Sequence, residues 1–373
     1  MSQLDTNGYY ALGIPFYFAV IGIEILVARR QKREVYGFAD TIGNFSAGLG
    51  EVIVGLFLGP ILLAMYDFAF TRMAVVYWPK DSLIPWILAF ALGDFCYYWY
   101  HRAGHHVAAF WAIHSVHHQT ERFNISVATR HPWFSDGYSF IFYIPVPMLG
   151  IPPFHFFVAI SIISFYALTV HSQIFHRPGF WFLVTPATHI VHHAKNPRYM
   201  NHNFGAMFTV WDRMFGTHVE VDPADPPQLG TTFGYQTHDG ARSQWIFFQD
   251  ILTVARNAKT FGDKVRAFVR HPGWAPEGMV FPKHAPPRSD AAISTGIKVY
   301  TLCAFMATLG FGVYLLWLRD NHPAWILALG AIAVLWGLST LGGLLDGREG
   351  AETRERIRVA ATVALGVAIY VNR

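Results

Sequence analysis

Histidines are the residues of this sequence whose type and spacing could do chemistry. Two segments, HSVHH at residues 114–118 and HIVHH at residues 189–193, each place three imidazoles within five residues. Fifteen of the nineteen histidines fall between residues 101 and 218, where an even distribution would place about six. Because neutral imidazole is the commonest metal-binding side chain, a cluster this dense predicts a metal site.

The spacing of these histidines is that of one helix face. His101 and His105 are four residues apart, and each HxxHH segment places its histidines at i, i+3 and i+4. Side chains at these separations project from the same side of a helix and can bind one ion together. His171 follows an apolar run and is expected to lie level with the others. The nine candidate ligands are His101, His105, His114, His117, His118, His171, His189, His192 and His193.

The number of candidate ligands favours two metal ions. A single zinc ion takes about three or four protein ligands, so nine suit two ions with about four or five ligands each. Imidazole binds zinc, copper, iron and nickel, so ligand type alone does not choose the metal. Cys96 and Cys303 form no CxxC pair, which excludes a thiolate site. His176 is a candidate for a tenth ligand.

Two polar residues are candidates for supporting the ligands. Asp94 lies on the helix stripe that carries His101 and His105. A carboxylate in an apolar run needs a partner, so Asp94 is expected to accept a hydrogen bond from a ligand imidazole, or else to pair with Arg102. Asn203, in the polar segment after the second HxxHH, is a candidate hydrogen-bond donor beside the site.

The composition is that of a membrane protein. Hydrophobic residues make up 53% of the chain and charged residues 14%, against about 25% charged in a soluble domain. The net charge of +4 is spread along the chain and does not predict nucleic-acid binding. Prolines break the run at 138–170, which predicts a helical hairpin. The apolar runs cover residues 9–28, 46–70, 83–100, 138–170, 298–317, 323–344 and 357–371.

We therefore expect an all-α fold, an integral-membrane helical bundle with a histidine-rich di-metal domain at its cytosolic face. Arg29 and Arg30 follow the first run, and positive charge marks the cytosolic end of a membrane helix. Residues 243–270 are expected to form either a helix on the membrane surface or a cap on this domain. The expected domains are N-terminal membrane helices (1–82), the catalytic domain (83–221), an interfacial segment (222–296) and C-terminal membrane helices (297–373).

The histidine blocks resemble a known enzyme family. DFCYYWYHRAGHHVAAFWAIHSVHH at residues 94–118 and HIVHHAKNPRYMNHNFGAMFTVWDRMFGT at residues 189–217 are similar to the fatty acid hydroxylase / sterol desaturase superfamily of integral-membrane di-iron enzymes. Within it the chain most resembles the alkylglycerol monooxygenase group, through NISVATR at 124–130, His171 and HPGW at 271–274. The resemblance covers about residues 85–280.

The resemblance implies two iron ions held by the nine histidines, dioxygen as oxidant, and an alkyl or acyl chain that enters from the bilayer. The metal site would face the cytosol from a multi-pass protein, in the inner membrane of a bacterium or the endoplasmic reticulum of a eukaryote. The alkylglycerol monooxygenases have a glutamate where this chain has His106. Tetrahydrobiopterin, the reductant of that group, is therefore only one alternative. No cytochrome-like heme motif or dinucleotide loop is present, so the electron donor is expected to be external.

The predicted activity is oxidation of a lipid by a membrane-bound di-iron oxygenase. Attack on an unactivated C–H bond needs a strong oxidant, which a metal pair that reduces dioxygen supplies and side chains do not. Desaturation by an enzyme of the same superfamily is the alternative. A metal hydrolase would want an HExxH motif, which the sequence lacks. A metal transporter would place its ligands at the middle of the bilayer.

Overall fold

The predicted all-α architecture is confirmed. A computed structural model describes residues 6–174, 180–285, 287, 289–317 and 319–371, and within these ranges every regular element is a helix. The α-helices are α1 (Thr6–Arg30), α2 (Phe38–Met73), α3 (Ile84–His106), α4 (Ala108–His118), α5 (Ser135–Tyr143), α6 (Pro145–Met148), α7 (Pro153–Thr169), α8 (Pro186–His192), α9 (Val210–Met214), α10 (Gly240–Asn257), α11 (Phe261–Val269), α12 (Thr295–Trp317), α13 (Ala324–Leu345) and α14 (Ala351–Val371). Three short 3-10 turns, η1 (Ile125–Thr129), η2 (Asp290–Ala292) and η3 (Arg319–Asn321), complete the set for these residues.

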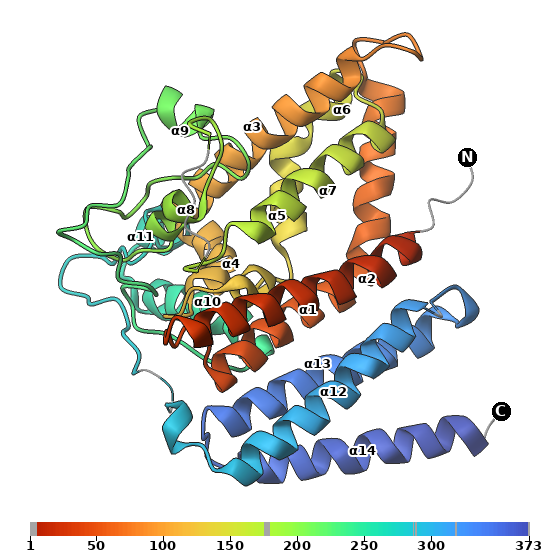
Figure 1. The fold of residues 1–373 in the computed structure, drawn as a ribbon, viewed down its shortest axis with the longest axis vertical. Coiled ribbons are helices and arrows are strands. Elements are labelled where there is room, and N and C mark those ends of the chain that lie inside the picture. The colour runs from red at the N-terminus through yellow and green to blue at the C-terminus, as the bar shows by residue number, and fades with distance from the viewer. Residues whose placement is uncertain (1–5, 175–179, 286, 288, 318, 372–373) are drawn as a thin grey trace.

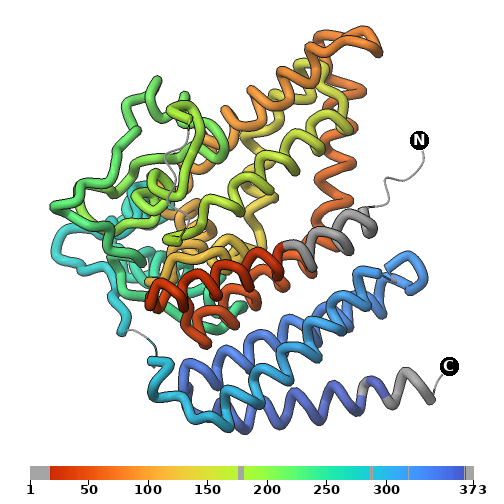
Figure 2. Tube along the Cα trace, viewed as in Figure 1, coloured from red at the N-terminus to blue at the C-terminus, as the bar shows by residue number. Residues whose placement is uncertain are grey.

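Three of the described helices, α2, α12 and α13, are long and apolar enough to cross a membrane. They cover the predicted runs at 46–70, 298–317 and 323–344. One hydrophobic core joins them, in which Ile53 of α2 and Leu338 and Leu341 of α13 are fully buried. Figures 1 and 2 show α12, α13 and α14 as a layer of long helices beside α1 and α2.

The proline-broken run at 138–170 folds into α5, α6 and α7. Pro145 begins α6, and Pro153 begins α7, because proline lacks the N–H that an interior helical position needs. Gly150 turns the chain between them with a φ of +77°, a backbone conformation that suits glycine. The returning helix α7 packs along α3, which carries the first two candidate ligands.

The segment 243–270 forms a cap on the histidine-rich domain. It contains α10 and α11, separated by a break after Asn257. Phe247, Ile251 and Val254 of α10 are buried and pack with Trp111 of α4. The apolar face of α10 therefore packs against the histidine-rich domain. Of the two predicted arrangements, this contact favours the cap for α10.

The short helices gather at one end of the long ones. Figure 1 shows α4, α8, α9, α10 and α11 together at this end, where α3 and α7 also terminate. This arrangement brings the four histidine-bearing segments together: the end of α3, α4, the residues that follow α7, and α8.

Candidate metal centre

The structure brings all nine predicted histidines together in two groups, each with ligand nitrogens within 4.8 Å of one another. We call them the five-histidine group and the four-histidine group. Every member of both groups is buried. The five-histidine group is His101, His105, His114, His118 and His192, and the four-histidine group is His117, His171, His189 and His193.

Local sequence sets where the histidine-bearing helices begin and end. A break at Val107 separates α3 from α4, so the HxxxH and the first HxxHH lie on two helices that meet at an angle. Thr185 caps α8 in a capping box with Thr188, and Pro186 occupies the first turn. The cap fixes the start of α8 only four residues before His189.

The Nε2 atoms converge within each group. In the five-histidine group, Nε2 of His114 lies 3.0 Å from Nε2 of His101 and 3.0 Å from Nε2 of His118. In the four-histidine group, Nε2 of His171 lies 3.1 Å from that of His117 and 2.9 Å from that of His189. Two nitrogens bound at right angles to one ion at about 2.1 Å are themselves about 3.0 Å apart, so these separations are those of neighbouring ligands.

The hydrogen bonds on the far side of the rings favour the same interpretation. Nδ1 of His117 lies 3.2 Å from the Arg130 carbonyl, and Nδ1 of His171 lies 2.9 Å from the Ala167 carbonyl. A carbonyl oxygen only accepts, so in both rings the proton sits on Nδ1 and the lone pair on Nε2. The lone pairs of two Nε2 atoms then face each other, and they repel each other unless a cation lies between them.

The five-histidine group has the same arrangement. Nδ1 of His101 lies 2.8 Å from the Phe204 carbonyl, and Nδ1 of His192 lies 3.0 Å from the His202 carbonyl. Nε2 of His105 is buried without a hydrogen-bond partner among the described residues. Buried polar atoms are rarely left unsatisfied, so this orphaned nitrogen also fits a bound metal ion. The donor set therefore fits two transition-metal ions.

Burial keeps these imidazoles neutral. The pKa values of His114, His118 and His192 are held well below the usual range, first by burial and then by neighbouring histidines. The pKa of His193 in the other group is lowered for the same two reasons. Neutral rings retain the lone pairs that metal binding needs.

Asp94 supports the site differently from the prediction. Its carboxylate accepts hydrogen bonds from the backbone N–H groups of Met207 (2.9 Å) and Phe208 (3.3 Å), and from Nε1 of Trp211 (2.9 Å). The expected bond to a ligand imidazole is wrong, because the Phe204 carbonyl takes that place at His101. Asp94 instead anchors the loop that carries this carbonyl.

A second carboxylate holds the same loop. Asp212 of α9 accepts from the backbone N–H groups of Phe204 (2.8 Å) and Gly205 (2.9 Å) and from the Thr217 hydroxyl (2.7 Å). The loop is therefore fixed immediately beside the carbonyl that orients His101. A bond of this kind sets the tautomer and orientation of a metal-binding imidazole.

Asn203 acts through the backbone of α8. Its side-chain amide donates to the carbonyls of Thr188 (2.8 Å) and Val219 (2.7 Å), and its oxygen accepts from the Val219 N–H (2.8 Å). Thr188 immediately precedes His189. Asn203 thus links the start of α8 to the segment around Val219. Among the described residues its side chain makes no hydrogen bond to a candidate ligand ring.

The chain carries a recognised domain over this region. Residues 86–217 match the family model described as fatty acid hydroxylase, which includes every one of the nine histidines. This match supports a likeness to the fatty acid hydroxylase / sterol desaturase superfamily. The match spans α3 to α9 and leaves the long C-terminal helices outside it.

Similar proteins extend the likeness beyond that domain. It is 27% identical to alkylglycerol monooxygenase of Xenopus tropicalis over 364 residues, which cover 95% of this chain and 81% of the relative. Ornithine lipid hydroxylase OlsE of Rhizobium tropici is 27% identical over 42% of this chain and 47% of its own length. A Delta(7)-sterol 5(6)-desaturase of Leptosphaeria maculans is 29% identical over 46% of this chain and 48% of its own length. No solved structure matches.

Two residues that support the site were not predicted from the sequence. Glu24 of α1 is fully buried, where it accepts from Tyr36 Oη (2.5 Å), the Ile125 N–H (2.8 Å) and the Ser172 hydroxyl. Ser172 directly follows His171, so Glu24 ties α1 to the four-histidine group. The available signal was a carboxylate inside the first apolar run.

Arg130 is the other missed residue. It is 2% exposed, and its guanidinium donates to the carbonyls of Val116 (2.8 Å) and Thr237 (2.9 Å) and to the Gln119 side chain (2.8 Å). Val116 and Gln119 flank His117 and His118. No spacing rule marks one arginine of a loop as buried, because its partners come from distant parts of the chain.

The remaining histidines near the site do not join the groups. His106 is exposed and its Nδ1 lies 2.8 Å from the Arg102 carbonyl. His131 pairs with Glu51 at 3.2 Å. His176, the candidate tenth ligand, lies outside the described residues.

Replacing Asp94 with alanine is expected to loosen the 204–211 loop. The change leaves two backbone N–H groups and the Trp211 indole without their acceptor, which should lower the free energy of unfolding by about 2–4 kcal/mol. Trp211→Phe is the matched control, since it removes only one of the three donors and should cost about 1 kcal/mol. Thermal unfolding and iron content of the detergent-purified proteins measure both effects. Equal losses in the two variants would contradict the anchoring role.

Proposed function

We propose that this protein is a membrane-bound lipid monooxygenase that holds one iron ion in each histidine group and uses dioxygen and electrons from an external donor. The observation that carries the proposal is the convergence of nine buried imidazoles into groups of five and four. A bound iron pair supplies the oxidising power that attack on an unactivated C–H bond needs. The chain's residues hold the ions, orient the ligand rings and exclude water.

A donor set made only of neutral imidazoles favours a redox-active metal pair. The two groups contain no carboxylate, so bound ions would keep a high positive charge, unlike those of carboxylate-bridged di-iron bundles. Nine ligands also exceed what one hydrolytic zinc ion takes. A zinc hydrolase or a metal transporter therefore fits this donor set less well.

Apolar hollows near the site suit a lipid tail. A cavity of about 220 Å³ lies between α3 and the α5–α6 segment, lined on α3 by Phe95, Cys96 and Trp99. Trp99 precedes His101 by two residues, so the cavity lies against the helix that carries His101 and His105, two members of the five-histidine group. An alkyl chain in it would have its apolar surface removed from water.

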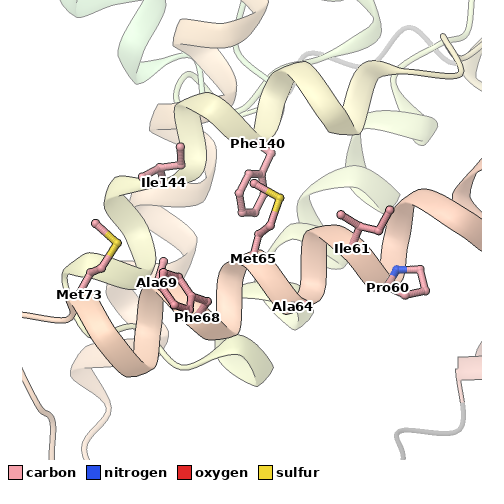
Figure 3. Close-up of a pocket in the computed structure, with 9 residues that line it drawn as sticks. All are labelled: Pro60, Ile61, Ala64, Met65, Phe68, Ala69, Met73, Phe140 and Ile144. Atoms are coloured by element: carbon pink, nitrogen blue, oxygen red, sulfur yellow. The ribbon is translucent and has the colours of Figure 1, made fainter.

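A larger groove lies farther along the bundle. Figure 3 shows it between α2 and α5, with Met65 and Phe140 facing each other across it. Its volume is about 700 Å³ and its lining is apolar. Such a groove on membrane helices suits an acyl or alkyl chain that arrives from the bilayer.

The site is proposed to face the cytosol. Arg29 and Arg30 end α1 at the same end of the bundle as the histidines, and Arg33 donates to the Gln173 carbonyl at 2.8 Å, two residues beyond His171. Positive charge accumulates on the cytosolic side of membrane helices. An electron donor in the cytosol, or tetrahydrobiopterin, would then reach the site directly.

Hydroxylation is favoured over desaturation. Alkylglycerol monooxygenase of Xenopus tropicalis aligns with 95% of this chain, whereas the sterol desaturase of Leptosphaeria maculans aligns with 46%. An ether lipid such as an alkylglycerol is the proposed substrate, with an acyl chain as the alternative.

Metal analysis and lipid profiling test the proposal. Purified protein is expected to contain two iron ions per chain, because each group offers enough ligands for one. Lipids from cells with and without the gene are expected to differ by a species that gains one oxygen or loses an ether-linked tail. A new double bond would indicate a desaturase, and a single zinc ion per chain would contradict the proposal.

A further inference from the structure

A polar cavity of about 460 Å³ lies apart from the histidine groups, between α10, α13 and the start of α14. Three of its lining residues are arginines from three elements: Arg242 of α10, Arg348 of the turn after α13, and Arg354 of α14. Glu349 is the one acid in the lining. Trp336, Ser339, Thr340 and Gly343 of α13 complete the wall.

The cavity has an excess of positive charge. Arg348 pairs with the buried Asp239 and lies 3.5 Å from Asp346. Arg354 donates to the Glu349 carbonyl at 2.6 Å, and among the described residues no carboxylate pairs with Arg354 or with Arg242. Two guanidinium groups are thus left with unused donors.

The acids of α14 near the cavity are already paired. Glu355 is buried behind Thr340, which donates to it at 2.6 Å, and Arg358 pairs with the same carboxylate. Glu352 lies 3.8 Å from Arg356 on the exposed side of α14. A ligand would therefore meet Arg242 and Arg354, whose two positive charges exceed the single negative charge of Glu349 in the lining.

The wall of the cavity is held rigidly. Asp239 caps α10 by accepting from the N–H groups of Ala241 and Arg242, both at 2.9 Å, and also accepts from the Ser339 hydroxyl at 2.9 Å. Gly342 lets α13 approach this cap closely, since a Cβ there would lie 2.2 Å from the Asp239 Cα. The position of Arg348 is therefore set by packing before any ligand binds.

The cavity also lies where a membrane surface would be. The apolar span of α13 ends at Leu345, and arginines follow within a few residues. Its α10 wall belongs to the cap of the histidine-rich domain. Basic pockets between membrane helices at this depth bind anionic headgroups.

We propose that this cavity binds the phosphate group of an anionic phospholipid. Guanidinium groups present paired N–H donors that match phosphate oxygens, and three of them line this cavity. The apolar span of α13 leads away from the cavity. The inference does not depend on the oxygenase activity, because it uses none of the histidines.

Native mass spectrometry of the detergent-purified full chain tests this site. Wild-type protein is titrated with phosphatidylglycerol, with phosphatidylcholine and with inorganic phosphate. Phosphatidylglycerol is expected to bind best. Arg242→Gln and Arg354→Gln should each weaken its binding about fivefold, because each guanidinium near an anionic surface contributes about that factor. Both residues are exposed, so thermal unfolding and iron content should stay unchanged.

Arg356→Gln is the matched control. Arg356 lies two residues from Arg354 on the other side of α14 and is 82% exposed, so its replacement should leave lipid binding intact. Wild-type affinity in the Arg242→Gln/Arg354→Gln double variant would overturn the proposal. Displacement of phosphatidylglycerol by inorganic phosphate would assign the site to a soluble phosphate compound and would overturn the lipid assignment.

Discussion

His192→Ala and His117→Ala are each expected to abolish lipid oxidation and to remove about half of the bound iron. His192 belongs to the five-histidine group and His117 to the four-histidine group, so each change takes one ligand from one proposed ion. Losing a residue that only orients a ligand lowers metal affinity about 10–100-fold, and losing the ligand itself should cost at least about 100-fold. Iron per chain and product formation measure the two effects.

The control for these variants is His106→Ala. His106 is adjacent to His105 but exposed, and its ring lies outside both groups. Its replacement should leave iron content and turnover near the wild-type values. Full turnover by His192→Ala or by His117→Ala would contradict the two-ion site, provided that the variant is recovered from the membrane fraction.

Arg130→Ala is expected to give the largest loss of stability outside the ligands. It would leave the buried acceptors of Val116, Gln119 and Thr237 without their donor. Breaking a buried, hydrogen-bonded charge in this way costs about 3–5 kcal/mol. Because the same acceptors flank His117 and His118, iron content should fall as well. Thermal unfolding in detergent, with and without added iron, checks both results.

Arg122→Ala is the comparison that separates burial from charge. Arg122 pairs with Asp40 at 3.3 Å and donates to the Glu34 and Tyr36 carbonyls, both at 3.2 Å, but its side chain is 35% exposed, so solvent screens the pair and can replace the lost donor. Its loss should change the free energy of unfolding by no more than about 1 kcal/mol. An Arg130→Ala variant as stable as Arg122→Ala would mean that the buried hydrogen bonds around α4 matter little.

The long apolar helices beside the site were largely predictable. A long apolar run that crosses a bilayer folds as a helix, because its backbone N–H and C=O groups must form their hydrogen bonds within the segment. The runs at 46–70, 298–317 and 323–344 accordingly correspond to α2, α12 and α13. Pro145 and Pro153 marked the breaks of the hairpin, since proline is tolerated at the first turn of a helix and not inside it.

The supporting contacts of the site were not predictable. Asp94 was expected to bond an imidazole and instead accepts from Met207, Phe208 and Trp211, more than a hundred residues away along the chain. The helix stripe gave the direction of its side chain, but the partner depends on which loop folds over that stripe. Glu24 and Arg130 were missed for the same reason.

The sequence alone determined which residues face one another within each helix, because the α-helix repeat places i, i+3 and i+4 on one side. This repeat supplied eight of the nine histidines, and the place of His171 at the end of an apolar run supplied the ninth. Only the tertiary structure decided how they divide: the first HxxHH gives His114 and His118 to one group and His117 to the other, while the second gives His192 to the first group and His189 and His193 to the second. That division depends on the angles at which α3, α4 and α8 meet and on the loops that hold them, and these are set by contacts between segments far apart in the chain.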